Sequence, residues 1–155
     1  MSKEFQQGDI VWFYFPKEKT QPQYTIKGEH PALILHDNET PNKTVILCPI
    51  TSLYDKKGNK KNLKSFHLPL YKADYPNLIN DSYAKLDQIM TFSRNKLNTN
   101  NKIDHLNATD KVSLHLKLIE ILQMQDTLKE YISKQIEHTV NEVLKEYINK
   151  LNEDV

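Results

Sequence analysis

Three groups of polar side chains could act on a phosphate ester, two of them where a predicted strand begins or ends and one within a predicted strand. In "PITS", Thr51 and Ser52 end a strand, and their hydroxyls could hold a phosphate oxygen or simply cap a turn. In "YAKLDQ", period-2 alternation points Lys85 and Asp87 to one face, as a solvated surface pair or as members of a site. In "KGEHPALIL", His30 stands directly before an apolar run, either as a reactive imidazole or as a loop residue without a role.

A lysine-rich segment could bring a polyanion to these groups. Residues 56–64 contain five lysines and one glycine, and they are predicted to form a solvent-exposed hairpin loop. Read alone, such a loop is a solvated tip. Together with Lys17, Lys19 and Lys27 it predicts a rim that attracts phosphates.

The elements that must position these groups are short strands rich in β-branched and aromatic residues and separated by polar turns. The predicted strands cover residues 8–15, 31–36, 44–52, 65–70, 82–92 and, as a last short one, 102–106. Pro69 should keep its strand at a sheet edge. Because no helical pattern lies between these strands, they predict a small antiparallel barrel or curled sheet.

The chain changes character near residue 107, after which it has neither proline nor glycine and its apolar spacing becomes helical. Asn107 or Thr109 can cap the first helix. A second amphipathic segment follows, and its apolar stripe runs from Leu128 to Leu151. We expect a break near residues 125–127, the alternative being one continuous helix. The stripe could pack on the same chain or on a second chain. The predicted domains are therefore residues 1–124 and a helical extension, residues 125–155.

Composition and charge restrict the classes of protein that fit. The chain has 155 residues and a net charge of +1, which divides into +4 for residues 1–100 and −3 for residues 101–155. The first part is therefore the better candidate for binding anions. Cys48, inside "VILCPI", is expected to be an inert core thiol. The N-terminus is too polar for a signal peptide, and no apolar run could cross a bilayer, so we expect a cytoplasmic protein that does not bind membranes.

The motifs of several enzyme classes are missing. The six histidines include no i,i+4 pair and no neighbouring cysteine ligand, so no metal site is expected. There is also no glycine-rich phosphate loop and no G-x-S-x-G segment. These absences exclude P-loop NTPases, Rossmann enzymes and α/β-hydrolases, and no cofactor is expected.

The order of the segments resembles the MazF/PemK/Kid family of bacterial toxins, which are the toxin halves of toxin–antitoxin pairs. The residues that carry the resemblance are the opening "GDIVW", the G-x-x-P of Gly28 to Pro31, "PITS" and "LDQIMTFSRNKL". The resemblance covers about residues 8–124. It implies an α+β protein with a small SH3-like antiparallel β-barrel followed by helices, to which this chain adds a C-terminal amphipathic helix.

The resemblance also implies an activity and partners. Members are metal-independent, sequence-selective endoribonucleases in which the 2′-hydroxyl of the RNA attacks the adjacent phosphate. The products are a 2′,3′-cyclic phosphate and a 5′-hydroxyl. Single-stranded RNA, a cognate antitoxin protein and a second copy of the chain are the partners implied.

Carried over position by position, the resemblance gives the candidate site. His30 stands where the family has an arginine before the proline, and Lys85 and Asp87 stand where the Kid/PemK branch has Arg-x-Asp. Thr51 and Ser52 match the family's Thr-Ser. The catalytic candidates are His30, Asp87, Lys85 and Thr51. The RNA-binding candidates are Ser52, Lys27, Lys56, Lys57, Lys60, Lys61 and Gln88.

The two replaced arginines leave two alternatives open. Histidine can transfer protons near neutral pH, so His30 could supply proton transfer while Lys85 supplies charge. Lysine, however, cannot grip two phosphate oxygens in a fork as arginine does. The alternative is therefore a catalytically impaired module that binds RNA or a protein. A gyrase poison like the CcdB toxins fits least, because those end in a tryptophan-containing tail and the single tryptophan here is Trp12.

Overall fold

The structure is a computed structural model that describes residues 5–17, 24–39 and 43–153. The chain divides into two compact units, residues 1–121 and residues 122–155, and each is described by itself. None of the described helices is both long enough and apolar enough to span a bilayer.

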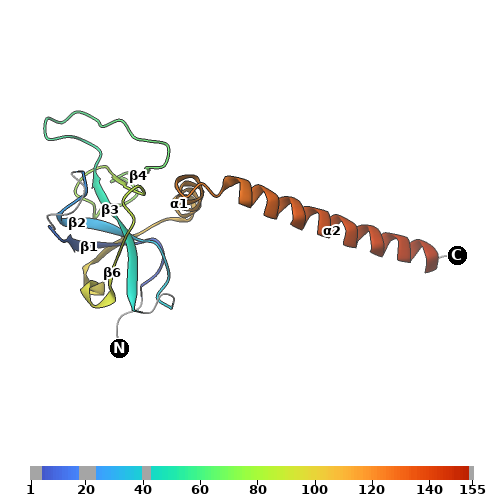
Figure 1. Cartoon of the computed structure of the whole chain (residues 1–155). Helices are drawn as coiled ribbons and strands as arrows, with labels where there is room; N and C mark the ends of the chain where they lie inside the picture. The colour runs from blue at the N-terminus through green and yellow to red at the C-terminus, as the bar shows by residue number, and fades with distance from the viewer. Residues whose placement is uncertain (1–4, 18–23, 40–42, 154–155) are drawn as a thin grey trace. The chain divides into compact units, whose positions relative to one another are not determined.

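In its described residues, the first unit contains seven strands, two 3₁₀ turns and one helix, most of which are labelled in Figure 1. The strands are β1 (Asp9–Phe15), β2 (Gly28–Ile34), β3 (Thr44–Ser52), β4 (Leu68–Leu70), β5 (Ser82–Ala84), β6 (Met90–Ser93) and β7 (Lys102–His105). The 3₁₀ turns are η1 (Arg94–Lys96) and η2 (Thr99–Asn101), and the helix is α1 (Ala108–Ile121). The second unit contains α2 (Gln125–Glu153).

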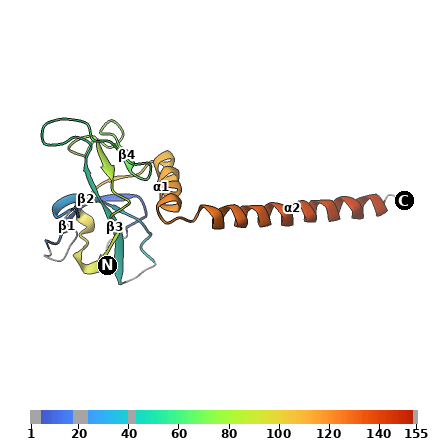
Figure 2. The same ribbon diagram turned by 45° about the horizontal axis from the view of Figure 1, so that its top comes forward.

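All strand pairs are antiparallel, and the strand order is β4-β5-β3-β2-β1-β7, with β6 also paired to β3. The long strand β3 pairs with β2 along one edge and with two different strands along the other. Its first half pairs with β6 and its last three residues pair with β5. Because one edge of β3 serves both β6 and β5, the sheet must curl around β3, and it forms the partial barrel of an α+β fold (Figures 1 and 2).

Neighbouring residues of the strands alternate between two buried clusters, one on each face of the sheet. On β2, Leu33 belongs to one cluster, whereas Ala32 and Ile34 belong to the other. On β3, Cys48 and Leu47 divide in the same way. This alternation explains why the central strands are apolar at consecutive positions: both of their faces are covered.

Helix α1 is fixed to the barrel at its first turn and along one side. Asn107 is its N-cap, and its Oδ1 accepts a hydrogen bond from the Asp110 backbone N–H at 2.8 Å. The Tyr75 hydroxyl donates to the Asp110 carboxylate and accepts from the Asn107 N–H. Leu114 is fully buried in the cluster that also contains Leu33. The helix therefore covers the β4 end of the barrel, as both ribbon views show.

The predicted helix break is present, although it lies slightly earlier than expected. α1 ends at Ile121 and α2 begins at Gln125, with Gln123 between them at a φ of 55°. The single continuous helix considered above is therefore wrong. Of the α2 residues whose exposure the structure describes, Leu128 is partly buried and the rest are exposed.

Three of the predicted strands differ clearly from the structure. The strand expected over residues 65–70 is confined to Leu68–Leu70, because residues 65–66 form a turn. The strand expected over residues 31–36 begins at Gly28, because β2 pairs with β1 as far as Phe15↔Gly28. The strand expected over residues 82–92 is broken into β5 and β6, which pair with opposite ends of β3. Residues between them form a turn in which the Gln88 N–H donates to the Lys85 carbonyl. A continuous strand could not serve both ends of the curled partner.

Candidate active site

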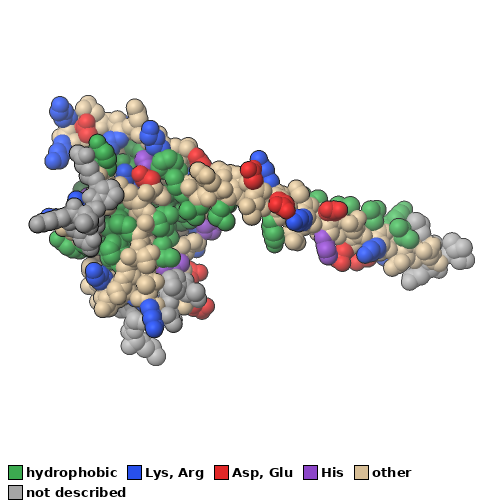
Figure 3. All heavy atoms as spheres, viewed as in Figure 1, with side chains coloured by type: hydrophobic (Ala, Val, Ile, Leu, Met, Phe, Trp, Pro, Cys, Tyr) green, Lys and Arg blue, Asp and Glu red, His purple; other side chains and the backbone are tan. Residues whose placement is uncertain are grey.

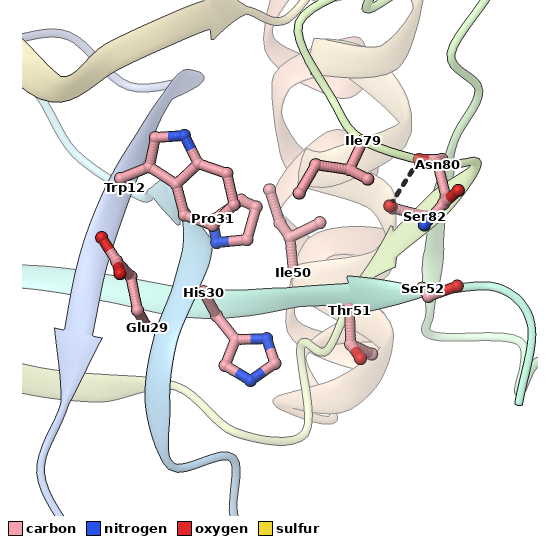
Figure 4. A pocket seen from close by; sticks show the side chains of 10 residues that line it. All are labelled: Trp12, Glu29, His30, Pro31, Ile50, Thr51, Ser52, Ile79, Asn80 and Ser82. Atoms are coloured by element: carbon pink, nitrogen blue, oxygen red, sulfur yellow. Dashed lines mark hydrogen bonds between the residues drawn. The ribbon is translucent and has the colours of Figure 1, made fainter. Parts of the chain in front are cut away.

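A pocket of about 250 Å³ opens where β2 and β3 separate. The two strands pair as far as Ala32↔Pro49, and beyond this pair β3 keeps only its pairing with β5, which lies along its other edge. The open space between the separated strands is the pocket (Figure 4). Its walls come from four parts of the barrel and are formed by Trp12, Glu29, His30, Pro31, Ile50, Thr51, Ser52, Ile79, Asn80 and Ser82.

His30 lies inside β2, opposite Phe13 of β1, rather than in the loop where the sequence alone placed it. Gly28 begins the strand at a φ of 87°, a conformation that favours glycine. The side chain of His30 is partly exposed at the pocket. In Figure 4, His30 and Thr51 project to one side of β3, whereas Ile50 and Ile79 project to the other. Asn80 and Ser82 lie on the same side as Ile79, so the pocket has polar side chains on both sides of β3.

Thr51 and Ser52 both line the pocket, but only Ser52 has the turn-capping role considered from the sequence. The Ser52 Oγ accepts a hydrogen bond from the Tyr54 N–H at 3.1 Å. The Ser52 carbonyl accepts one from Lys61 Nζ at 2.8 Å. Lys61 is therefore tied to the end of β3, whereas Thr51 is the hydroxyl placed beside His30.

Lys85 and Asp87 do not line this pocket; they form a second polar group with His67 on the turn between β5 and β6. Lys85 Nζ lies 3.8 Å from Asp87 Oδ2, and His67 Nε2 lies 3.4 Å from Asp87 Oδ1. The Asp87 side chain is 35% exposed, whereas the side chains of His67 and Lys85 are 9% and 15% exposed. Asp87 is therefore the member of this group that solvent and ligands reach most easily.

The strand register brings the two groups together. Thr51 pairs with Tyr83, so their side chains lie on the same face. The Lys85 N–H donates to the Pro49 carbonyl at 2.9 Å, which continues this pairing by two residues and puts Lys85 on that face as well. The His67 ring packs on Tyr83 with their centroids 4.8 Å apart. Thr51 and Tyr83 therefore connect the His30 pocket to the Asp87 group.

The lysine-rich loop is exposed, as predicted, and Figure 3 shows basic side chains at its outer edge. Lys56, Lys57 and Lys60 are exposed, as is Lys27 at the start of β2. Lys61 is the member of the loop that turns inward, where its Nζ lies 5.8 Å from the centre of the Tyr83 ring. Lys19 lies outside the described residues.

Gln88 has a structural partner that the sequence did not suggest. Its side-chain oxygen accepts a hydrogen bond from the Ile26 N–H at 2.9 Å, and its nitrogen donates to the Tyr24 carbonyl at 2.8 Å. These bonds hold the segment that leads into β2. A role for Gln88 in binding RNA stays a prediction.

Burial sets the protonation of the groups around Asp87. It lowers the pKa of His67, and the positive charges of Lys85 and Lys117 act in the same direction, whereas Asp87 opposes the change. Burial also raises the pKa of Tyr83, with the Asp87 charge adding to it. The same effect raises the pKa of Cys48, which is fully buried, as expected for a core thiol.

Sequence reasoning missed His67 and Tyr83. The signal that could have found them is the short strand after "SFH": β4 pairs Leu68 with Ala84, so the preceding residue, His67, faces Lys85. Among the described residues, no group of three or more His, Cys, Asp or Glu side chains is arranged to hold a metal ion.

Comparison with known proteins decides the family. A model of the PemK-like, MazF-like toxins of type II toxin–antitoxin systems matches residues 6–122. The chain belongs to this family. The match covers the first unit of the toxin and leaves α2 outside it. No curated protein matches the toxin's sequence significantly.

Solved structures share the fold at low sequence identity. MazF (Form-I) from Deinococcus radiodurans is 19% identical, with a TM-score of 0.56 over 78% of this toxin and 98% of that chain. An endoribonuclease in complex with its cognate antitoxin, from a mycobacterial species, is 14% identical, with a TM-score of 0.53 over 76% and 94%. The MazE–MazF complex (Form-II) from Deinococcus radiodurans is 18% identical, with a TM-score of 0.52 over 77% of this toxin and 96% of that chain. These likenesses establish the SH3-like curled barrel that the sequence predicted.

Proposed function

We propose that this toxin is a sequence-selective, metal-independent endoribonuclease that cleaves single-stranded RNA by attack of the 2′-hydroxyl. The observation that carries the proposal is that His30 and Thr51 share a pocket, and that the pairing of Thr51 with Tyr83, on which His67 packs, links this pocket to the Asp87 group. The family supports the same activity. We place the nuclease in the predicted domain of residues 1–124.

The reaction requires a base, an acid and groups that stabilise the charge on phosphorus. An ionised carboxylate only accepts hydrogen bonds, so we assign Asp87 as the base that takes the proton of the 2′-hydroxyl. A protonated imidazole can donate, so we assign His30 as the acid that protonates the departing 5′-oxygen. Lys85 and the Thr51 hydroxyl would stabilise the pentacovalent phosphorane, which gathers negative charge as the bonds exchange.

The remaining polar residues would hold the RNA outside the reacting bond. Ser52 lies beside Thr51 in the pocket, and the exposed lysines 27, 56, 57 and 60 can neutralise phosphates along the strand. Lys61 and Gln88 would contact the RNA from side chains that are already hydrogen-bonded to the backbone. Lys61 is bonded to Ser52, and Gln88 is bonded to residues 24 and 26. We also infer a homodimer in the cytoplasm that is neutralised by a cognate antitoxin. The antitoxin complex of a relative supports this inference.

The test is to incubate the purified toxin with a long end-labelled RNA in EDTA and to identify the new ends. We expect fragments with 2′,3′-cyclic phosphate and 5′-hydroxyl ends, and no cleavage of an RNA that carries 2′-deoxyribose at the cleaved position. RNA that stays intact but is bound would favour the impaired binding module. Products with 5′-phosphate ends would exclude attack by the 2′-hydroxyl.

The proposed site predicts the effect of two substitutions. His30→Ala and Asp87→Ala should each lower the cleavage rate by roughly 10²- to 10⁴-fold, the usual contribution of a general acid or base. His138→Ala and Asp126→Ala are the matched controls, because both side chains are exposed on α2. They should cleave at the wild-type rate. Full activity in both site variants would refute the assignment.

A further inference from the structure

His67 stands out among the buried polar side chains. The residue is 8% exposed, and its Nε2 is the buried side-chain nitrogen or oxygen that lacks a formed hydrogen bond in the described part of the chain. Asp87 Oδ1 lies 3.4 Å from this nitrogen, which is longer than an ordinary hydrogen bond. A buried polar atom left in this state calls for an explanation, since such atoms are nearly always paired.

The contact on the other ring nitrogen fixes which atom carries the proton. His67 Nδ1 accepts a hydrogen bond from the Lys64 backbone N–H at 3.2 Å, so in the neutral ring the proton sits on Nε2. The ring itself is held edge-on to Phe66, with centroids 4.9 Å apart, and against Tyr83. The ring is therefore fixed in position, with Nε2 3.4 Å from Asp87 Oδ1 but without a formed hydrogen bond.

The surroundings favour the neutral ring. Burial lowers the pKa of His67, and the charges on Lys85 and on Lys117 of α1 lower it further, against the opposing pull of Asp87. Tyr83, the other titratable group against the ring, has a raised pKa and stays neutral. A neutral donor can direct a carboxylate without cancelling its charge, which a base must keep.

We propose that His67 is a positioning residue: its Nε2–H holds Asp87 Oδ1, so that Oδ2, beside Lys85, is left for the substrate's 2′-hydroxyl. This inference rests on the proposed endoribonuclease activity. The 3.4 Å contact shortens to a hydrogen bond when RNA fills the site, as catalytic contacts often do on binding. His67 does not touch the RNA itself, because its side chain is 9% exposed.

Two substitutions separate this role from a purely structural one. Glutamine places an amide nitrogen near the position of Nε2, whereas asparagine places an oxygen near Nδ1 and keeps the bond to Lys64 but not the contact with Asp87. We expect His67→Gln to keep kcat within a few-fold of wild type. His67→Asn should lower kcat by roughly 10- to 100-fold, since a misplaced group costs about this much, with KM unchanged. Equal kcat values for the two variants would overturn the proposal.

A measurement that does not depend on cleavage keeps the inference apart from the proposed function. Nitrogen-15 NMR of His67 should show a neutral ring protonated on Nε2. Asp87→Asn should lower the pKa of His67 further, because the Asp87 charge supports protonation. If this coupling appears but the wild-type toxin leaves RNA intact, the nuclease proposal fails. The His67 proposal fails if RNA is cleaved but the neutral ring is protonated on Nδ1. It also fails if RNA is cleaved but Asp87→Asn leaves the pKa of His67 unchanged.

Discussion

The barrel and the α2 helix carry equally regular apolar patterns, but only the barrel buries its pattern within its own unit. Leu33 of β2 is 0% exposed, whereas Ile136 of α2 is 59% exposed. In the barrel, two clusters cover both faces of the curled sheet. Over its described residues, 122–153, the second unit has one helix and no second element against which the apolar stripe of that helix could pack.

This difference shows what periodicity does and does not specify. A pattern of apolar residues fixes the local structure and the face that prefers burial, but it does not say what covers that face. The charged pairs along α2, such as Lys134 with Glu130 at 2.7 Å, are exposed and add only tenths of a kcal/mol to an isolated helix. A helix of this kind owes most of its stability to whatever packs on it.

The largest effect should come from truncating the barrel core. Leu33→Ala removes a fully buried side chain from a closely packed cluster, so it should lower the free energy of unfolding by about 2–5 kcal/mol. Denaturant unfolding followed by the fluorescence of Trp12 would measure it. A loss below about 1 kcal/mol would mean that the barrel packs far more loosely than the structure shows.

A smaller effect should come from the buried carboxylate of Asp9, which is 1% exposed. It accepts hydrogen bonds from Lys102 Nζ at 2.6 Å, His105 Nδ1 at 2.7 Å and the Gln6 N–H at 2.9 Å. Burial acts to raise the pKa of Asp9, but these partners outweigh burial and leave the pKa below its ordinary value. Asp9→Asn should therefore cost roughly 1–3 kcal/mol at neutral pH, the typical cost of breaking such a buried bond.

The sign of the pH dependence follows from the lowered pKa. A carboxylate with a lower pKa in the folded state stabilises that state fully above its unfolded pKa, and this contribution is lost as the pH falls through the folded value. The stability difference between wild type and Asp9→Asn should thus shrink below about pH 4. Glu130→Gln on α2 removes an ion pair that is about as short as that between Asp9 and Lys102 but is exposed to solvent. This substitution should change the free energy of unfolding little at any pH.

The fold was largely predictable, because the sequence carries local signals for most of its elements. The strand 44–52 matches β3 at both ends, and Asn107 caps α1 as expected. The strand expected over residues 82–92 was wrong because residues 85–89 lie opposite only two residues of β3, 48–49, and therefore form a turn between β5 and β6. No pattern within residues 82–92 records this difference in length.

The candidate residues could be named from the sequence, and the resemblance suggested a role for each, but the site itself stays a prediction. Thr51, Ser52 and His30 do share a pocket, but the separation of β2 from β3 that opens it is a property of three strands together. His67 escaped notice because its importance comes from a contact 20 positions away in sequence, with Asp87. The contact could be predicted only once the register of β4 against β5 was known.

The smallest effect should come from Ile136→Ala, the counterpart of Leu33→Ala on the exposed helix. Surface substitutions rarely change stability by more than about 0.5 kcal/mol, and alanine favours a helix, so the unfolding temperature of the first unit should not move. Thermal unfolding over a hundredfold range of protein concentration is the decisive measurement. A loss of stability that grows on dilution would show that a second chain covers the stripe. A loss independent of protein concentration would show that the barrel of the same chain covers the stripe. In either case the apolar pattern of α2 would be buried, as that of the barrel is.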